Sequence, residues 1–118
     1  MTLGLAFLKI PVTDLGRAVD FYCTGFGLTA DFVSNEYGWA QLGGADMGLA
    51  LYVAGKGGGD GVPGQDRDFH LAADDLEALL ARLTPLTAQA AIVENDDGSR
   101  SLDVKDPDGN GLRIMARS

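Results

Sequence analysis

The chain contains one pattern twice, and this internal repeat limits its possible folds more than any other feature. The first copy is FLKIPVTDLGRAVDFY, from Phe7 to Tyr22, and the second is DFHLAADDLEALLARL, from Asp68 to Leu83. Each copy starts with alternating apolar residues, as in a β-strand, and continues past an aspartate into apolar residues at helical spacing. The sequence therefore predicts two modules of similar structure.

Three short runs follow each predicted helix and have the composition of β-strands. They are separated by Gly, Asn and Asp, and the pair Asp97-Gly98 is a strong hairpin signal. We therefore expect an α+β fold with two βαβββ modules, each a curved mixed sheet with one helix packed outside. The six runs are TADFVSN, YGWAQLGG and MGLALYV in the first half, and AAIVEN, SRSLDVKD and GLRIMARS in the second.

The ends of the two helices also have recognisable signals. Thr13 or Asp14 is expected to cap the first helix, and Asp74 the second, where Glu77 three residues later resembles a capping box. The residues that predict the helix ends are glycines and a proline, which disfavour continuation of a helix: Gly25, Gly27 and Pro85.

A chain of 118 residues fits one domain. We expect residues 1–118 to form a single domain, with module one at 1–54, a glycine-rich connector at 55–66 and module two at 67–118. The connector sequence AGKGGGDGVPG lacks the order GxxxxGK[ST] of a phosphate-binding loop. It is expected to be a flexible link or a lid over a binding cleft.

Charge and composition exclude several classes of function. The net charge is −8, which argues against nucleic acid as a partner, because such binding depends on basic side chains. The acidic charge indicates solubility or, as the alternative, a preference for cationic ligands. No apolar run is long enough to span a membrane, and the single cysteine, Cys23, excludes an internal disulfide. We expect a cytoplasmic protein without a membrane or nucleic-acid partner.

Side chains alternate along a strand, so the strand residues opposite the apolar phase share a second face. That face mixes aromatic and charged groups, which is typical of a small-molecule cleft. The alternatives are a solvated face and a dimer interface. The ligand-binding residues predicted in this way are Phe7, Lys9, Trp39, Gln41, Tyr52, Asp68, His70, Asp103, Arg113 and Met115.

Several segments together resemble the vicinal oxygen chelate superfamily, which includes glyoxalases, ring-cleaving dioxygenases, fosfomycin-modifying enzymes and bleomycin-resistance proteins. The resemblance extends from about Leu5 to Ala116 and implies the duplicated fold more strongly than any chemistry, because function depends on the site. The segments that carry it are VTDLGRAVDFYCTGFGL, LAADDLEAL and DPDGNGLRI.

In metal-using members of that superfamily, the resemblance places ligands at four positions, which here are Phe7, Ala50, Asp68 and Arg113. A phenyl ring and a methyl group cannot bind a divalent ion, and a guanidinium group repels one. Asp68 is the one plausible ligand among the four, with His70 two residues later. We therefore expect no metal cofactor, and we expect Arg113 to replace the positive charge of the metal, pairing with Asp68 across the cleft.

Two functions are compatible with this site. The first is a metal-free protein that binds a small organic molecule, such as an antibiotic or a planar, cationic compound. The alternative is a glyoxalase- or dioxygenase-type enzyme that uses a divalent metal or acid–base chemistry by His70, since imidazole groups commonly titrate near neutral pH. A regulatory module without a small ligand is the third possibility. The resemblance implies a homodimer for the first two.

Overall fold

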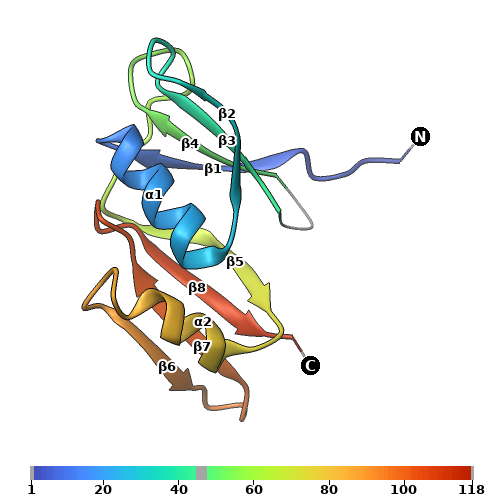
Figure 1. The fold of residues 1–118 in the computed structure, drawn as a ribbon. Helices are drawn as coiled ribbons and strands as arrows, with labels where there is room; N and C mark the ends of the chain where they lie inside the picture. Colours follow the sequence, from blue (N-terminus) through green and yellow to red (C-terminus); the bar gives the residue numbers. More distant parts are fainter. Residues whose placement is uncertain (1, 45–47, 118) are drawn as a thin grey trace. The chain divides into compact units, whose positions relative to one another are not determined.

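The computed structural model describes residues 2–44 and 48–117 of the chain, which form two compact units. The first unit extends to Pro63 and the second begins at Gly64. Each unit contains one four-stranded mixed sheet and one helix, so the expected α+β fold with two βαβββ modules is confirmed (Figure 1). Met1, Met47 and Ser118, which the predictions from sequence include, lie outside the described residues.

The sheet of the first unit has the strand order β1-β4-β3-β2. The pair β1 and β4 is parallel, whereas β4 with β3 and β3 with β2 are antiparallel. Helix α1 packs on β2, β3 and β4. The elements of this unit are β1 (Phe7–Val12), α1 (Leu15–Phe26), β2 (Thr29–Ser34), β3 (Trp39–Gly43) and β4 (Gly48–Val53).

The second unit repeats this arrangement with the order β5-β8-β7-β6. The pair β5 and β8 is parallel, the other pairs are antiparallel, and α2 packs on β6 and β7. Within the described residues, no helix is long and apolar enough to cross a membrane. The elements are β5 (Asp66–Ala73), α2 (Leu76–Leu83), β6 (Ala90–Glu94), β7 (Arg100–Lys105) and β8 (Gly111–Ala116).

The helix caps agree with the sequence in type but differ in two positions. The carboxylate of Asp14 accepts a hydrogen bond from the backbone N–H of Arg17 at the start of α1. At α2 the cap is Asp75 rather than Asp74, because it is Asp75 whose carboxylate accepts the corresponding bond. Gly25 does not end α1, which continues to Phe26, and Gly27 then adopts a left-handed conformation at φ 70°.

The core of each unit lies between its sheet and its helix. In the second unit, Leu112 and Ile114 alternate with more exposed residues on β8, and both are almost fully buried, as is Leu102 on β7. Leu76 and Leu83 of α2 are buried as well. Burying such side chains stabilises the fold by roughly 1.5–3 kcal/mol each. The opposite face of each sheet therefore lies outside this core.

Candidate functional site

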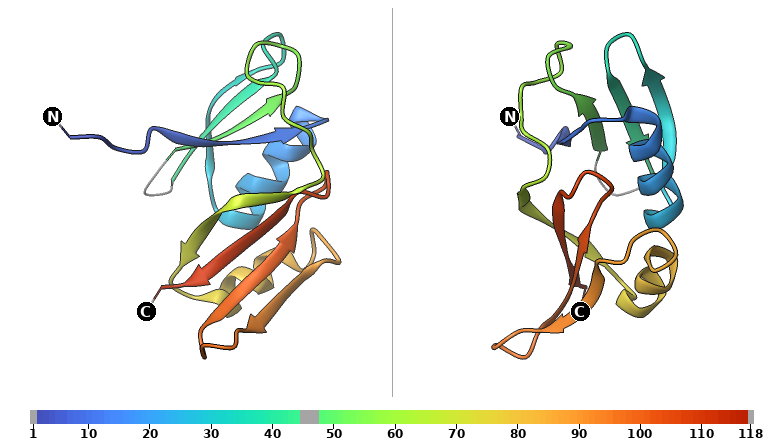
Figure 2. Two further views of the ribbon diagram at one scale, coloured as in Figure 1. Left: turned by 180° about the vertical axis from the view of Figure 1, so that it is seen from behind. Right: turned by 90° about the vertical axis from the view of Figure 1, so that its left-hand side faces the viewer.

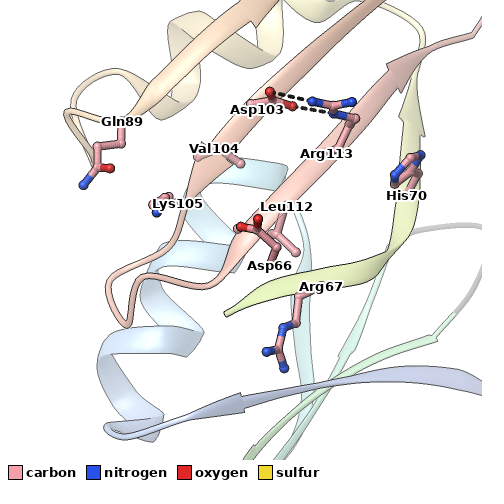
Figure 3. A pocket seen from close by; sticks show the side chains of 10 residues that line it. Asp66, Arg67, His70, Gln89, Asp103, Val104, Lys105, Leu112 and Arg113 are labelled. Carbon is pink, nitrogen blue, oxygen red and sulfur yellow. Dashed lines mark hydrogen bonds and ion pairs between the residues drawn. The ribbon is translucent and has the colours of Figure 1, made fainter. Parts of the chain in front are cut away.

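A pocket of about 410 Å³ lies on the second unit, and two strands of its sheet provide most of the charged lining. The volume is within the range of small-molecule sites. Figure 3 shows the side chains around the opening. The lining residues are Asp66, Arg67, His70, Gln89, Asp103, Val104, Lys105, Gly111, Leu112 and Arg113.

Strand pairing arranges these side chains in two rows across the sheet face. In the first row Asp66 of β5 lies opposite Gly111 of β8, and Gly111 lies opposite Lys105 of β7. In the second row Arg113 of β8 lies between His70 of β5 and Asp103 of β7. Directly opposite residues point to the same side of a sheet. The register therefore brings three of the predicted residues, His70, Arg113 and Asp103, side by side.

Arg113 forms a two-pronged ion pair with Asp103. Its Nε donates to Oδ1 at 2.8 Å and its Nη2 donates to Oδ2 at 3.0 Å (Figure 3). This hydrogen-bonded carboxylate, followed by the charge of Asp103 and that of Asp66, raises the pKa of Arg113 above its ordinary value. The expectation that Arg113 pairs with Asp68 is wrong, because the β7–β8 register places Asp103 beside it instead.

Asp68 does not line the pocket, although the sequence places it two residues before His70. The register of β5 and β8 shifts between Asp66 and His70, so the simple alternation does not hold in this stretch. Asp66 takes the place over Gly111, where the absence of a Cβ leaves room for its carboxylate. Simple strand alternation did not predict Asp66 and Arg67 as site residues. Gly111 at the start of β8 was the available signal, because a glycine in a strand often marks a place where another group approaches the backbone closely.

Met115 belongs to the next row along the sheet, opposite Ala72 and Ser101, and lies outside the pocket. Ser101 is fully buried, and its hydroxyl accepts a long bond of 3.4 Å from the Asn95 side chain. This row contributes none of the lining residues of the pocket.

The other five predicted residues lie in the first unit. Pairing of β1, β4 and β3 places Phe7, Lys9, Trp39, Gln41 and Tyr52 on one sheet face. The rings of Phe7 and Trp39 meet edge to face with their centroids 5.5 Å apart. The indole N–H of Trp39 donates a long hydrogen bond of 3.4 Å to the side-chain oxygen of Gln41. These aromatic groups are thus already engaged with one another.

The glycine-rich connector covers part of this face. The ammonium group of Lys9 donates to the carbonyl of Gly58 at 2.8 Å, and the N–H of Gly61 donates to the hydroxyl of Tyr52 at 3.1 Å. Figure 2 shows the connector and α1 on opposite sides of the first sheet. Tyr52 is 6% exposed as a result. Its ring is therefore not open to a stacking ligand in this conformation, in contrast to what the strand alternation suggests.

Adding a methyl group at Gly58 is expected to displace the connector. A Cβ there would lie 2.8 Å from Cε3 of Trp39, which is too close, so Gly58→Ala should cost about 1–3 kcal/mol of unfolding free energy. Trp39 is the single tryptophan, so iodide quenching of its fluorescence reports on the cover directly. We expect stronger quenching in Gly58→Ala than in the control Gly4→Ala, whose added methyl would meet nothing within 4 Å. Equal quenching in both variants would contradict the cover.

The residues at the four positions implied by the resemblance do not fit a metal ion. Within residues 2–44 and 48–117, no three His, Cys, Asp or Glu side chains are grouped so that they could hold one. Arg113 brings a positive charge to the position, and its partner Asp103 is already occupied by two hydrogen bonds from it. A catalytic divalent metal usually requires three protein ligands.

The thiol of Cys23 is a poor nucleophile. Burial in α1, and secondly the nearby charge of Asp20, raise the pKa of Cys23 above its ordinary value. The reactive thiolate is therefore disfavoured at neutral pH.

Comparison with known proteins identifies the family. Residues 4–114 match the model of the Glyoxalase/Bleomycin resistance protein/Dioxygenase superfamily, so the chain belongs to this superfamily. No curated protein matches the chain.

Solved structures share the fold at low sequence identity. A member of the same superfamily from Sphaerobacter thermophilus is 21% identical over 98% of both chains, with a TM-score of 0.78. A lactoylglutathione lyase from Agrobacterium tumefaciens is 20% identical over 96% of this chain and 92% of its own, with a TM-score of 0.79. A bleomycin-binding protein complexed with bleomycin is 20% identical over 99% of this chain and all of its own, with a TM-score of 0.71.

Proposed function

We propose that this protein binds a small organic molecule without a metal ion, in the pocket of the second unit around Arg113. The observation that carries the proposal is the fixed guanidinium group of Arg113, held by Asp103 on the floor of a pocket. A small number of well-positioned polar groups in a concave surface is the usual basis of small-molecule recognition.

The geometry of Arg113 supports a role in binding. Asp103 engages Nε and Nη2, so the N–H groups of Nη1 can donate to a ligand. The arginine side chain is 42% exposed, so a ligand can reach it. An arginine already oriented by a carboxylate loses little conformational freedom when it binds, which favours affinity.

We include antibiotics among the possible ligands, and we propose that the protein assembles as a homodimer. A bleomycin-binding protein is among the structures with this fold, which supports the antibiotic class. The homodimer is proposed because similar proteins pair their modules. The native mass spectrometry described below measures the mass of the assembly as well as that of a bound ligand.

A second candidate function is acid–base catalysis by His70. This histidine lines the same pocket and lies opposite Arg113 in the strand register. An imidazole beside a guanidinium group could exchange a proton with a ligand that Arg113 holds. Turnover of a bound ligand that is lost in His70→Gln, with binding unchanged, would favour this function over simple binding.

Native mass spectrometry of the protein purified from its own host without chelators tests the proposal. We expect a dimer that carries an organic ligand of defined mass and no metal. A dimer with one divalent ion per subunit would overturn the metal-free proposal and favour the enzyme. A monomer that carries an organic ligand would retain the binding function and exclude the dimer.

A further inference from the structure

The side chains that line the pocket around Arg113 include more cations than carboxylates, whereas the chain as a whole is acidic. Three lining residues are cationic, Arg67, Lys105 and Arg113, whereas two are carboxylates, Asp66 and Asp103. The whole chain has a net charge of −8. A local excess of positive charge in an acidic protein attracts anions to this place specifically.

Lys105 and Arg113 lie close enough to act on one anion. They are diagonal neighbours on adjacent strands, since Lys105 is opposite Gly111 and Arg113 is two residues further along β8. Diagonal neighbours on one face are about 7–8 Å apart, within reach of long side chains. Within the described part of the chain, no carboxylate forms an ion pair with Lys105, and Asp103 is paired with Arg113.

Gly111 lies between these two cations in the strand register. The carboxylate of Asp66 occupies the space over Gly111 that a side chain there would fill, with Lys105 on the other side of the glycine. The charge of this carboxylate contributes, as the smallest cause, to the raised pKa of Arg113. A ligand that lies against this carboxylate would thus meet two cations and one acceptor.

We infer that this pocket recognises a small organic acid whose carboxylate lies between Lys105 and Arg113 and whose neighbouring O–H or N–H group donates to Asp66. The inference rests on the proposed function and names its ligand class. None of the described lining residues is Phe, Tyr or Trp, so recognition here depends mainly on charge and hydrogen bonds. A cationic ligand, which the acidic composition suggested, would meet the more numerous like charges.

Four probes separate the parts of this recognition. Malate carries a hydroxyl group next to a carboxylate, succinate lacks the hydroxyl, malamide lacks both charges, and inorganic phosphate is a simple anion. Each is titrated into the full isotope-labelled chain, and binding is followed by NMR shifts of the backbone amides. Loss of one charge-assisted hydrogen bond weakens binding about tenfold. We therefore expect malate to bind about tenfold more tightly than succinate, and malamide to bind most weakly.

Three variants assign these effects to residues. Lys105→Gln should weaken malate and succinate about tenfold each, because both lose one charged partner. Asp66→Ala should remove the preference for malate and tighten succinate, because both the acceptor and the repelling charge of the carboxylate have gone. The matched control is Arg100→Gln, which removes an exposed ion pair with Glu77 in the same unit and should change no affinity.

Any of four results would overturn this inference. Malamide or phosphate binds as tightly as malate, malate does not bind at all, or Lys105→Gln and Arg100→Gln have the same affinity for malate. Such a result leaves the proposed function intact if a neutral or cationic organic molecule copurifies with the protein. Conversely, a divalent ion in the native protein removes the metal-free proposal, whereas the malate measurements still decide the acid recognition.

Discussion

Replacing Arg113 by alanine is expected to weaken malate binding by about a hundredfold, which is near the upper end for a charge-assisted contact. Two effects add in this variant. The ligand loses the Nη1 donor, and Asp103 loses the partner that neutralises it. The released carboxylate then repels the anion from within the pocket. Titration of the full chain with malate measures the loss.

The folded state should tolerate this change well. The side chains of Arg113 and Asp103 are 42% and 41% exposed, and ion pairs at such exposure contribute little to stability. The pKa of Arg113 is raised, so the group remains protonated below that pKa, and its role should not vary between neutral and mildly alkaline pH. Thermal unfolding of Arg113→Ala and of the control Arg100→Ala should therefore be similar.

The double variant Arg113→Ala/Asp103→Ala separates the two effects. It removes the released carboxylate, so we expect it to recover about tenfold of the lost malate affinity. If Arg113→Ala leaves the affinity for malate unchanged, Arg113 has no role in binding it. If the double variant binds malate no better than the single one, Asp103 does not repel the ligand.

The repeat predicted the fold because apolar spacing is a local property. Alternation along β7 and β8 was enough to place Leu102 and Ile114 in the core and Asp103 and Arg113 on the other face. The direct pairing of Asp103 with Arg113 could also have been predicted, since the two residues are equally far in sequence from the turn DPDGN. Counting outward from that turn pairs Lys105 with Gly111 and Asp103 with Arg113, as observed.

The remaining features of the site depend on contacts between distant segments. The register shift that separates Asp66 from His70 arises where β5 joins β8, and spacing within β5 gives no sign of it. The cover over Tyr52 depends on the path of the connector. Its glycines predicted a loop but not the surface on which it lies, because glycine permits many backbone conformations.

The shape of the turn DPDGN depends on two buried polar side chains. Asp106 and Asn110 are 5% and 0% exposed. One carboxylate oxygen of Asp106 accepts from the N–H groups of Asp108 and Asn110, each at 2.9 Å. Its other oxygen accepts from the side-chain amide of Asn110 at 2.9 Å, and the amide oxygen of Asn110 accepts from the N–H of Gly64 at 2.9 Å. Asn110 therefore joins the turn to the start of the second unit.

Asn110→Ala is expected to lower the unfolding free energy of the second unit by about 3 kcal/mol, since it leaves an oxygen of the buried Asp106 carboxylate without this bond and also removes the bond to the N–H of Gly64. The melting temperature should fall by about 10 °C. The matched control is Asp97→Ala in the β6–β7 turn, where the carboxylate also accepts a backbone bond, from Ser99, but is exposed to water. Water can replace that bond, so Asp97→Ala should lower the melting temperature much less. Similar melting temperatures for both variants would show that the buried network does not stabilise the turn. In that case it would not stabilise the register that aligns Arg113 with Asp103 either.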